Sequence, residues 1–258
     1  MINVILNADD FGINDDVNSA IVCCFKDGLI SNTTIMTNMP NSSDAVSLAK
    51  ENGFFDCVGL HLNLREGKPM TTGIISDKVF CSKGVFQMNI NPMKKYFFSS
   101  KGLKENEKEH LLEELEAQFR WYISAGFPEK HIDSHQSVHT WYLFLSAINP
   151  LFIKYQFHTM RKRVVGFNES LIKRKYRSFI NNRIHNPIST MYDISSFVNN
   201  YSMIKEVEYC EVMCHPIMKN GIPVDSLSGL PIEKVKNLDG VHLISYNEVK
   251  NLKNYSIK

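Results

Sequence analysis

The sequence predicts an α/β fold with a mainly parallel sheet or barrel, because short apolar runs alternate with longer helical patterns along the chain. The runs have the length of single strands, and apolar residues between them recur with helical spacing. A chain of 258 residues with 43% hydrophobic and 22% charged residues can bury a large core. No repeat or linker divides the chain, so we expect one domain over residues 1–258.

Seven apolar runs are candidate strands, and helices are expected between them. The candidate strands are Asn3 to Ala8, Ser31 to Thr37, Val58 to Leu64, His131 to Ser134, Phe157 to Arg161, Tyr209 to Cys214 and Val241 to Ser245. In a parallel α/β fold the reacting groups gather where strands end and loops lead into helices. Polar residues at the ends of these runs are therefore candidates for a site.

The clearest helix covers about Glu105 to Ser124, where apolar residues recur every 3.6 positions opposite a charged face. Asn14 or Asp15 is expected to cap a helix over residues 17–25. Asn41 or Ser42 is expected to cap another helix, which runs through residue 49. The segment from residue 67 to 104 has no strong periodicity and is predicted to form an excursion over the barrel mouth.

Composition and charge set limits on function. The net charge of +2 does not by itself indicate nucleic-acid binding, and no apolar run has the length of a transmembrane helix. Two aspartates within the first ten residues argue against a targeting signal, so a cytoplasmic location is the default. The six cysteines sit in apolar runs and are expected to be reduced thiols. The sequence does not specify the oligomeric state, and a homo-oligomer is compatible with it.

The first candidate cluster is Asp9 and Asp10, two adjacent carboxylates that end an apolar strand. Adjacent negative charges repel, and a metal ion is one way to compensate them, with one Asp as ligand and the other as base. The alternative is that both residues simply cap a turn. A second cluster places His61 and Asn63 on one side of an apolar strand. Taken alone, a histidine there is more often structural than a ligand.

The third cluster changes the interpretation of the second. His131, Asp133 and His135 stand at alternate positions, with His139 close by, so the first three project to one face of an extended segment. A histidine beside a carboxylate is typical of a metal ligand held in one tautomer. With Asp10 and His61, this cluster gives a two-histidine, one-carboxylate site for Zn²⁺ or another divalent ion, open to water and substrate.

His215 forms the fourth cluster, at the end of another apolar strand and directly before Pro216. There it could approach the same mouth as a general acid. The alternative is a histidine in an X-Pro turn. Convergence with the other three clusters favours a catalytic role.

Together these residues resemble a known family. The segments are NADDFG (7–12), GLHLNL (59–64), HIDSHQSVH (131–139) and EVMCHP (211–216). In order and spacing they are similar, across about 210 residues, to the YdjC/ChbG family of carbohydrate deacetylases, whose best-known members act on chitooligosaccharides. The resemblance implies a distorted (β/α) TIM-like barrel and a metal-dependent hydrolase that removes N-acetyl groups from an amino sugar or oligosaccharide and releases acetate.

The resemblance also implies roles for individual residues. Asp10, His61 and His135 would hold one divalent metal ion, with Zn²⁺ favoured over Mg²⁺ or another ion. Asp9 would be the general base and His215 the general acid. Asn63, Asp133, His131 and His139 would orient these groups or contact substrate. Family members commonly carry a further histidine where Ser137 stands, and a glycine where Ile217 stands, and both departures bear on the substrate.

The stretch from residue 161 to 183 is strongly basic, with eight Lys or Arg residues against one acidic residue, Glu169. It could bind a phosphate or diphosphate on an activated or lipid-linked sugar, or rest on an anionic membrane. The alternative is a solvated helix face, which such runs more often form.

Three other functions use similar residues. A metal-dependent phosphoesterase usually has more carboxylates and a second metal site, whereas the sequence shows one compact cluster. An amidohydrolase that acts on another amide would fit the same chemistry, and substrate panels would separate the two. An inactive sugar-binding module would not need to keep Asp9, Asp10, His135 and His215 together.

Overall fold

The computed structural model describes residues 1–87, 101, 103–164, 169–188, 190–204 and 209–249. Its main sheet has eight strands, all paired in parallel, in the order β7-β6-β3-β2-β1-β9-β8, with β12 also paired to β1. The strands are β1 Ile2–Phe11, β2 Asn32–Ile35, β3 Val58–Leu62, β6 His131–Ser134, β7 Thr159–Met160, β8 Met191–Asp193, β9 Tyr209–Cys214 and β12 Val241–Leu243. The prediction of a distorted α/β barrel is confirmed.

The sheet is curled, and its two edge strands therefore approach each other. A parallel bridge joins Met160 of β7 to Pro187, four residues before β8, and the amide of Ile188 donates to the Met160 carbonyl at 3.3 Å. Two antiparallel hairpins lie outside the sheet: β4 Cys81–Ser82 with β5 Val85–Phe86, and β10 Pro216–Lys219 with β11 Ile222–Asp225. Carboxyl ends of parallel strands thus collect at one end of the curled sheet.

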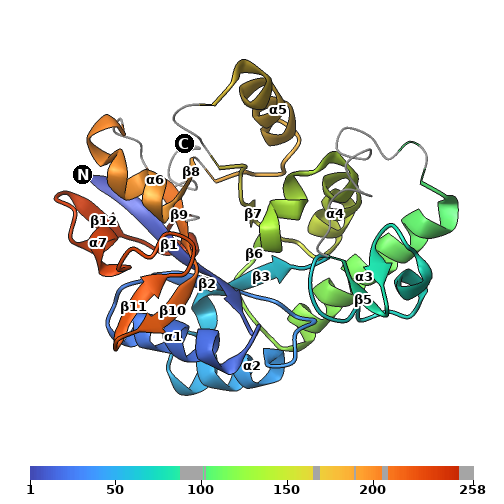
Figure 1. Ribbon diagram of the computed structural model, residues 1–258, viewed down its shortest axis with the longest axis horizontal. Coiled ribbons are helices and arrows are strands. Elements are labelled where there is room, and N and C mark those ends of the chain that lie inside the picture. Colours follow the sequence, from blue (N-terminus) through green and yellow to red (C-terminus); the bar gives the residue numbers. More distant parts are fainter. Residues whose placement is uncertain (88–100, 102, 165–168, 189, 205–208, 250–258) are drawn as a thin grey trace.

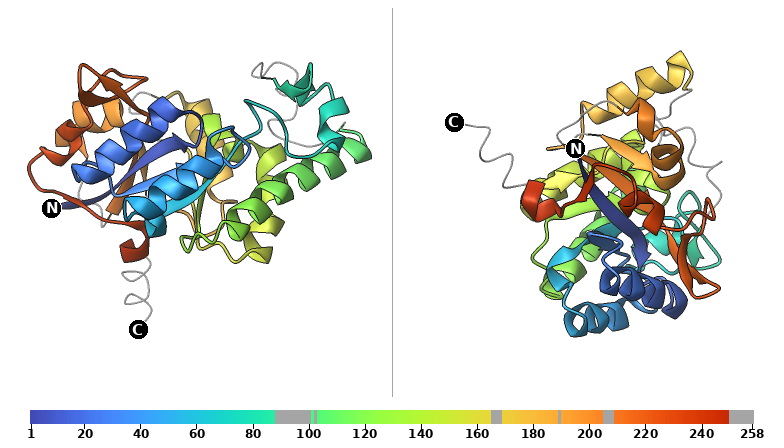
Figure 2. Two further views of the ribbon diagram at one scale, coloured as in Figure 1. Left: turned by 90° about the horizontal axis from the view of Figure 1, so that it is seen from below. Right: turned by 90° about the vertical axis from the view of Figure 1, so that its left-hand side faces the viewer.

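Helices cover the outside of the curled sheet (Figures 1 and 2). They are α1 Asp15–Lys26, α2 Ser42–Glu51, α3 Glu105–Ser124, α4 Tyr142–Lys154, α5 Leu171–Asn181, α6 Ile194–Asn199 and α7 Glu233–Lys236. The predicted bounds of α3 are confirmed. Asn14 caps α1 through its side chain, which accepts from Val17 N at 2.9 Å. Asn41 stands at the N-cap position of α2, but its amide instead donates to Asp15 Oδ1 at 2.6 Å.

The observed ends of β1, β3 and β6 differ from the sequence prediction, and each of these ends lies beside polar residues. β1 continues three residues past Ala8, through both aspartates. β3 ends at Leu62, so Asn63 lies in the following loop, and β6 ends at Ser134, so His135 begins a 3-10 segment, η4 (His135–Thr140). The prediction that His135 continues the face of a strand was therefore wrong.

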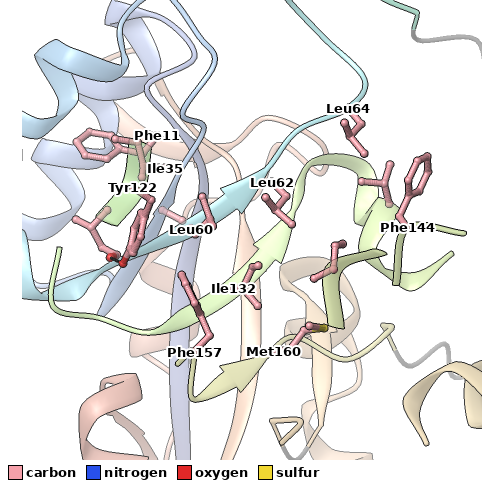
Figure 3. Close-up of a cluster of buried hydrophobic side chains, with 14 of the residues drawn as sticks. Phe11, Ile35, Leu60, Leu62, Leu64, Tyr122, Ile132, Phe144, Phe157 and Met160 are labelled. Carbon is pink, nitrogen blue, oxygen red and sulfur yellow. Dashed lines mark hydrogen bonds between the residues drawn. The ribbon is translucent and has the colours of Figure 1, made fainter. Parts of the chain in front are cut away.

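The outer face of the sheet packs an apolar core beneath the helices. Leu60 and Leu62 of β3 and Ile132 of β6 are fully buried, and they meet Tyr122 from α3 and Phe144 from α4 (Figure 3). Successive side chains of a strand point to opposite faces, so the residues on either side of Leu60, Leu62 and Ile132 face the barrel interior. The core therefore fixes which polar side chains enter the barrel.

A second, smaller apolar cluster closes the barrel interior below the polar layer. It contains Ile5, Ile188, Tyr209, Ile244, Tyr246 and Val249. The Tyr246 ring stacks on His131, with centroids 3.7 Å apart and planes 11° apart. This floor separates the polar interior from the amino ends of the strands.

Replacing Tyr122 by Phe is expected to cost about 1–3 kcal/mol in the free energy of unfolding. The Tyr122 hydroxyl is buried and lies 2.7 Å from the Val58 carbonyl and 2.6 Å from the Glu129 carbonyl, at the entries to β3 and β6. Urea denaturation would measure the loss. Tyr201→Phe is the control, because its hydroxyl bonds the exposed Asp239 carbonyl, and a loss of equal size there would contradict this account.

The described part of the predicted excursion over residues 67–104 packs against α3. Glu114 of α3 accepts hydrogen bonds from the amides of Met70 and Thr71, and His110 of α3 lies 2.8 Å from Asp77. The rest of that prediction falls on residues 88–100 and 102, outside the described part. All six cysteines are free, as expected. None of the described helices has the length and apolar character needed to cross a membrane.

Candidate active site and metal centre

Asp9 and Asp10 end β1, and an irregular backbone brings both carboxylates to one site. Consecutive residues of a regular strand point to opposite faces. Here the pairing between β1 and β2 shifts its register between Ala8 and Phe11, and Asp10 has a φ of 69°. A bulge of this kind re-aims a side chain. The Asp10 carboxylate therefore turns toward His61 in β3 and toward His135, which directly follows β6.

Three predicted residues meet at this point. Asp10 Oδ1 lies 3.1 Å from His61 Nε2 and 2.7 Å from His135 Nδ1. The other His61 nitrogen, Nδ1, lies 2.6 Å from Asp133 Oδ1 and 3.1 Å from Thr34 Oγ1. Asp133 thus orients the His61 ring so that Nε2 faces Asp10, as a partner to a metal-binding histidine does.

The donor set of Asp10, His61 and His135 fits a divalent metal ion. One possible ligand atom from each residue lies within 4.8 Å of the others. His61 Nε2 is buried and faces Asp10 Oδ1 at 3.1 Å without a well-aligned hydrogen bond in the described part of the chain, which suits a nitrogen and an oxygen that both direct a lone pair at a metal. Two histidines and a carboxylate suit Zn²⁺ and other divalent transition ions.

Two other buried groups also bring carboxylates and histidines together, but they already contain a cation. These groups are Asp9, His61 and Asp133, and His131, Asp133 and Glu211. Arg161 Nη2 lies 2.6 Å from Asp133 Oδ2, and Arg161 Nε lies 2.5 Å from Glu211 Oε1. The guanidinium therefore takes the place that a metal would need there.

Arg161 also binds Asp9 through two parallel hydrogen bonds, from Nη1 at 2.6 Å and from Nη2 at 2.7 Å. Its side chain is 1% exposed, and the three carboxylates around it are nearly as buried. Bidentate contact fixes the orientation of a carboxylate as well as its charge. Asp9 is thus held as an ionised group beside the candidate metal ligands.

Charge in this network shifts several pKa values. Burial alone would raise the pKa of Asp9, but the Arg161 charge and hydrogen bonds hold that pKa at about 2. Burial also acts on Glu211 and raises its pKa to about 7 against the pull of Arg161. For His61, burial would lower the pKa, but the carboxylates of Asp133 and Asp10 raise it to about 10 in the metal-free protein.

His215 approaches Asp9 from the opposite side, at the end of β9. Its Nε2 lies 3.9 Å from Asp9 Oδ2, and its Nδ1 lies 3.4 Å from Asp225 Oδ1. The same Asp225 oxygen accepts the His215 backbone N–H at 2.8 Å. His215 and Asp225 line a cleft of 340 Å³ together with Asp193, Met213 and Leu227. That volume is in the range of small-molecule sites.

Asn63 does not reach the metal-binding residues. Its side-chain amide donates to the Glu66 carbonyl at 2.7 Å and to Asn38 Oδ1 at 2.9 Å, which shapes the loop after β3. That loop presents Glu66, whose Oε2 lies 3.3 Å from His135 Nε2. Asn63 therefore acts on the site through the loop that carries Glu66.

His131 and His139 are fully buried and lie away from the cleft. His139 Nδ1 is 2.6 Å from Ser134 Oγ, and its Nε2 is 3.0 Å from the Arg161 carbonyl, so it supports the backbone that carries Arg161. Burial lowers the pKa of His139 to about 3 and that of His131 well below its ordinary value. Both are neutral packing residues in this structure. Ser137, in η4, has a φ of 53° and is partly buried.

Sequence analysis missed four residues of this site: Glu66, Arg161, Glu211 and Asp225. Arg161 ends a predicted strand, the position shared by the other candidates, but it was counted with the basic stretch. Glu211 lies within a buried strand, where an unpaired carboxylate is unfavourable and predicts a partner. No signal in the sequence singles out Asp225, which reaches His215 across the β10–β11 hairpin.

Comparison with known proteins identifies a family and relatives that cover most of the chain. A family model described as YdjC-like protein matches residues 3–239. A carbohydrate deacetylase of Clostridium beijerinckii is 27% identical over 257 residues, which cover 99% of this chain and 98% of that protein. A carbohydrate deacetylase of Vibrio parahaemolyticus is 28% identical over 231 residues, which cover 84% of this chain and 82% of that protein.

A crystal structure from Enterococcus faecalis V583, provisionally named as a cellobiose-phosphate cleavage protein, has a TM-score of 0.69 to this chain. It covers 96% of this chain and 98% of its own, at 22% identity, and this likeness shows a shared fold. The family match spans nearly all the described residues and includes every strand that carries a candidate site residue. The chain therefore belongs to the YdjC-like family.

Proposed function

We propose that this protein is a metal-dependent hydrolase that removes the N-acetyl group of an amino sugar or oligosaccharide and releases acetate. The observation that carries the proposal is the convergence of Asp10, His61 and His135, with a buried His61 nitrogen that faces Asp10 and makes no well-aligned hydrogen bond among the described residues. Relatives named carbohydrate deacetylase, which match nearly the whole chain, support the choice of substrate.

Asp10, His61 and His135 would hold the ion, with Zn²⁺ favoured. When bound, such an ion polarises a carbonyl and lowers the pKa of a water ligand to about 7. A carboxylate with a pKa of about 2, such as Asp9, is a weak base toward ordinary water. Asp9 can accept a proton only from a water that is already acidified, and Arg161 keeps its oxygens oriented for that step.

His215 would protonate the sugar amine as it leaves. Burial alone would lower the pKa of His215, but its hydrogen bond with Asp225 and the charges of Asp9 and Asp10 raise it. A raised pKa keeps the imidazole protonated at higher pH. Asp9 and His215 thus lie 3.9 Å apart, and the shifts in their pKa values favour the ionised carboxylate that a base requires and the protonated imidazole that an acid requires.

The first test is acetate release from N-acetylglucosamine, chitooligosaccharides and nucleotide- or lipid-linked N-acetyl sugars. Metal-loaded wild type is compared with Asp10→Asn and His135→Ala. Release that depends on added metal and is lost in both variants supports the proposal and identifies the substrate class. No release from any substrate by protein shown to contain metal would rule out this function.

Asp225→Asn is expected to move the alkaline limb of the pH profile of kcat/KM to lower pH. A general acid must be protonated, so activity falls as pH rises through the pKa of His215, and loss of the Asp225 charge lowers that pKa. Acetate release between pH 6 and 10 would measure the shift. Asp193→Asn is the matched control, because Asp193 lines the same cleft but bonds Ser195 and Ser196 instead. An unchanged limb in Asp225→Asn would exclude His215 as the titrating acid.

A further inference from the structure

Two residues in an unusual backbone conformation directly follow the candidate metal ligand His135. Gln136 has φ and ψ of 52° and 27°, and Ser137 has φ and ψ of 53° and 33°. This is the left-handed region, which glycine adopts readily and which most residues with a side chain adopt only at a cost. Two such residues in succession persist where surrounding contacts hold them. Their conformation determines the path of the backbone as it leaves His135.

Hydrogen bonds within η4 supply part of this restraint. The backbone N–H of His139 donates to Ser134 Oγ at 2.9 Å, and the Thr140 hydroxyl donates to the Ser137 carbonyl at 2.8 Å. These bonds join residues on the two sides of the left-handed turn. Neither bond involves Gln136, whose side chain is instead held from outside the segment.

Arg65, in the loop after β3, holds the side chain of Gln136. Arg65 Nε donates to Gln136 Oε1 at 3.0 Å, and Arg65 Nη1 donates to the Gln87 carbonyl at 3.1 Å. The backbone of Arg65 is itself fixed, because its N–H donates to Asn63 Oδ1 at 2.9 Å. β3 and β6 are neighbouring strands (Figure 1), so the loop that follows β3 can brace the segment that follows β6.

Arg65 is a buried cation whose partners are neutral. It is 1% exposed, and within the described part of the chain its side chain bonds only the two oxygens of Gln136 and Gln87. Burial lowers the pKa of the guanidinium, and residues 88–100, which follow Gln87 in the sequence, include no Asp or Glu. A buried charge without an opposite charge is unfavourable for folding, and an apolar residue of similar length is often at least as stable. The presence of an arginine here is therefore better explained by what it holds than by stability.

We propose that Arg65 is a positioning residue for metal binding: through Gln136 it holds the left-handed turn that directs His135 toward Asp10. This inference rests on the proposed metal-dependent function. His135 Nδ1 lies 2.7 Å from Asp10 Oδ1, and Glu66, the residue after Arg65, lies 3.3 Å from His135 Nε2. The loop after β3 thus contacts His135 directly through Glu66 and restrains its backbone through Arg65.

The test is a double-mutant cycle on the Zn²⁺ affinity of the metal-free full-length chain. Arg65→Met keeps much of the side-chain length and removes the donors, and Gln136→Ala removes the acceptor. We expect each variant to weaken Zn²⁺ binding about tenfold, as loss of a group that orients a metal ligand does. Because Arg65 acts through Gln136, the double variant should bind no more weakly than either single variant. Losses that multiply, or wild-type affinity in Gln136→Ala, would overturn the proposal.

Two control variants match these substitutions away from η4. Lys68→Met removes an exposed cation from the same loop. Gln156→Ala replaces an exposed glutamine that also has a left-handed backbone, with a φ of 56°, just after α4. Both variants should bind Zn²⁺ like the wild type. A tenfold loss in either control would show that the contact between Arg65 and Gln136 is not what sets the affinity.

Stability provides a second measurement, in which the expected change has the opposite sign. Arg65→Met removes a buried cation, so the urea midpoint of the metal-free protein should stay unchanged or rise. Replacing a residue that only supports the fold would lower that midpoint. A lower midpoint together with weaker Zn²⁺ binding would therefore refute the positioning role.

Neither measurement depends on turnover. Zn²⁺ affinities that follow the expected cycle in a protein that releases no acetate would refute the deacetylase function and leave the role of Arg65 intact. Losses that multiply in a protein that does release acetate would refute the role of Arg65 alone.

Discussion

Arg161→Met is expected to lower the free energy of unfolding by about 3–5 kcal/mol, the usual cost of leaving buried charges without their partner. Arg161 is the shared partner of Asp9, Asp133 and Glu211, all nearly inaccessible to solvent. Methionine keeps much of the side-chain length and removes the charge. Urea denaturation at pH 8 would measure the loss.

The loss should also depend on pH. In the wild type, the pKa of Asp9 is lowered from 3.8 to about 2, so its pairing stabilises the fold above pH 3.8 and stops doing so as pH falls toward 2. Without Arg161, burial raises the pKa values of Asp9 and Glu211, and each of these groups, when ionised, then costs stability as pH rises. We therefore expect Arg161→Met to be closer to wild type at pH 5 than at pH 8.

Arg163→Met is the matched control for this prediction. Arg163 is only partly buried, and its one described side-chain hydrogen bond goes to a threonine hydroxyl. Its loss should cost less than about 1 kcal/mol at either pH. If both arginine variants were destabilised equally, the buried carboxylates would not be the cause.

Asp10→Asn is expected to reduce the affinity for Zn²⁺ by more than about 100-fold and to abolish metal-dependent acetate release. Asp10 Oδ1 faces both His61 and His135, so this substitution removes the only anionic donor of the proposed ligand set. Titration of metal-free protein with Zn²⁺ would give the affinity. In the wild type the affinity should rise with pH, because the metal must displace the proton that His61 holds with a pKa of about 10.

Two further variants serve as comparisons for Asp10→Asn: Glu66→Gln, with a smaller expected loss of affinity, and Asp16→Asn, with none. Glu66 lies 3.3 Å from the outer nitrogen of His135, so its loss should weaken metal binding by about 10- to 100-fold, less than loss of Asp10. Asp16 is exposed on α1, away from the site, and its substitution should change nothing. Zn²⁺ affinity in Asp10→Asn equal to that of Asp16→Asn would show that the metal binds elsewhere.

Sequence patterns predicted those elements whose periodicity comes from burial. The bounds of α3 (Glu105–Ser124) and β9 (Tyr209–Cys214) agree with prediction, because each buries apolar side chains at regular spacing. Those of β6 (His131–Ser134) also agree, although Ile132 is its one buried apolar residue. β8 (Met191–Asp193) was missed because three residues are too few to show a period. The β10–β11 hairpin was missed because its strands are partly exposed and lack regular alternation.

In the candidate site, too, some residues were predicted from the sequence and others were missed. Asp9, Asp10, His61, His135 and His215 were found because each stands at or just after the end of a buried strand, and the structure brings all five together. Their partners were harder to find. Arg161 is paired with Asp9, 152 positions away, and this pairing depends on the curl of the sheet. Asp225 is paired with His215, 10 positions away, through the β10–β11 hairpin, and no local pattern in the sequence specifies either arrangement.

The positive φ of Asp10 determines which substitutions can test its chemistry cleanly. Asparagine adopts the left-handed region more readily than other residues with a side chain, so Asp10→Asn changes the charge and keeps the backbone. Asp10→Val would force a β-branched residue into a conformation that it rarely adopts, and would impair folding in addition to metal binding. An extended backbone at this position would instead direct the carboxylate toward the apolar layer beneath α1 and α2. One dihedral angle thus decides whether this acidic residue faces the two histidines of the proposed metal site or the core.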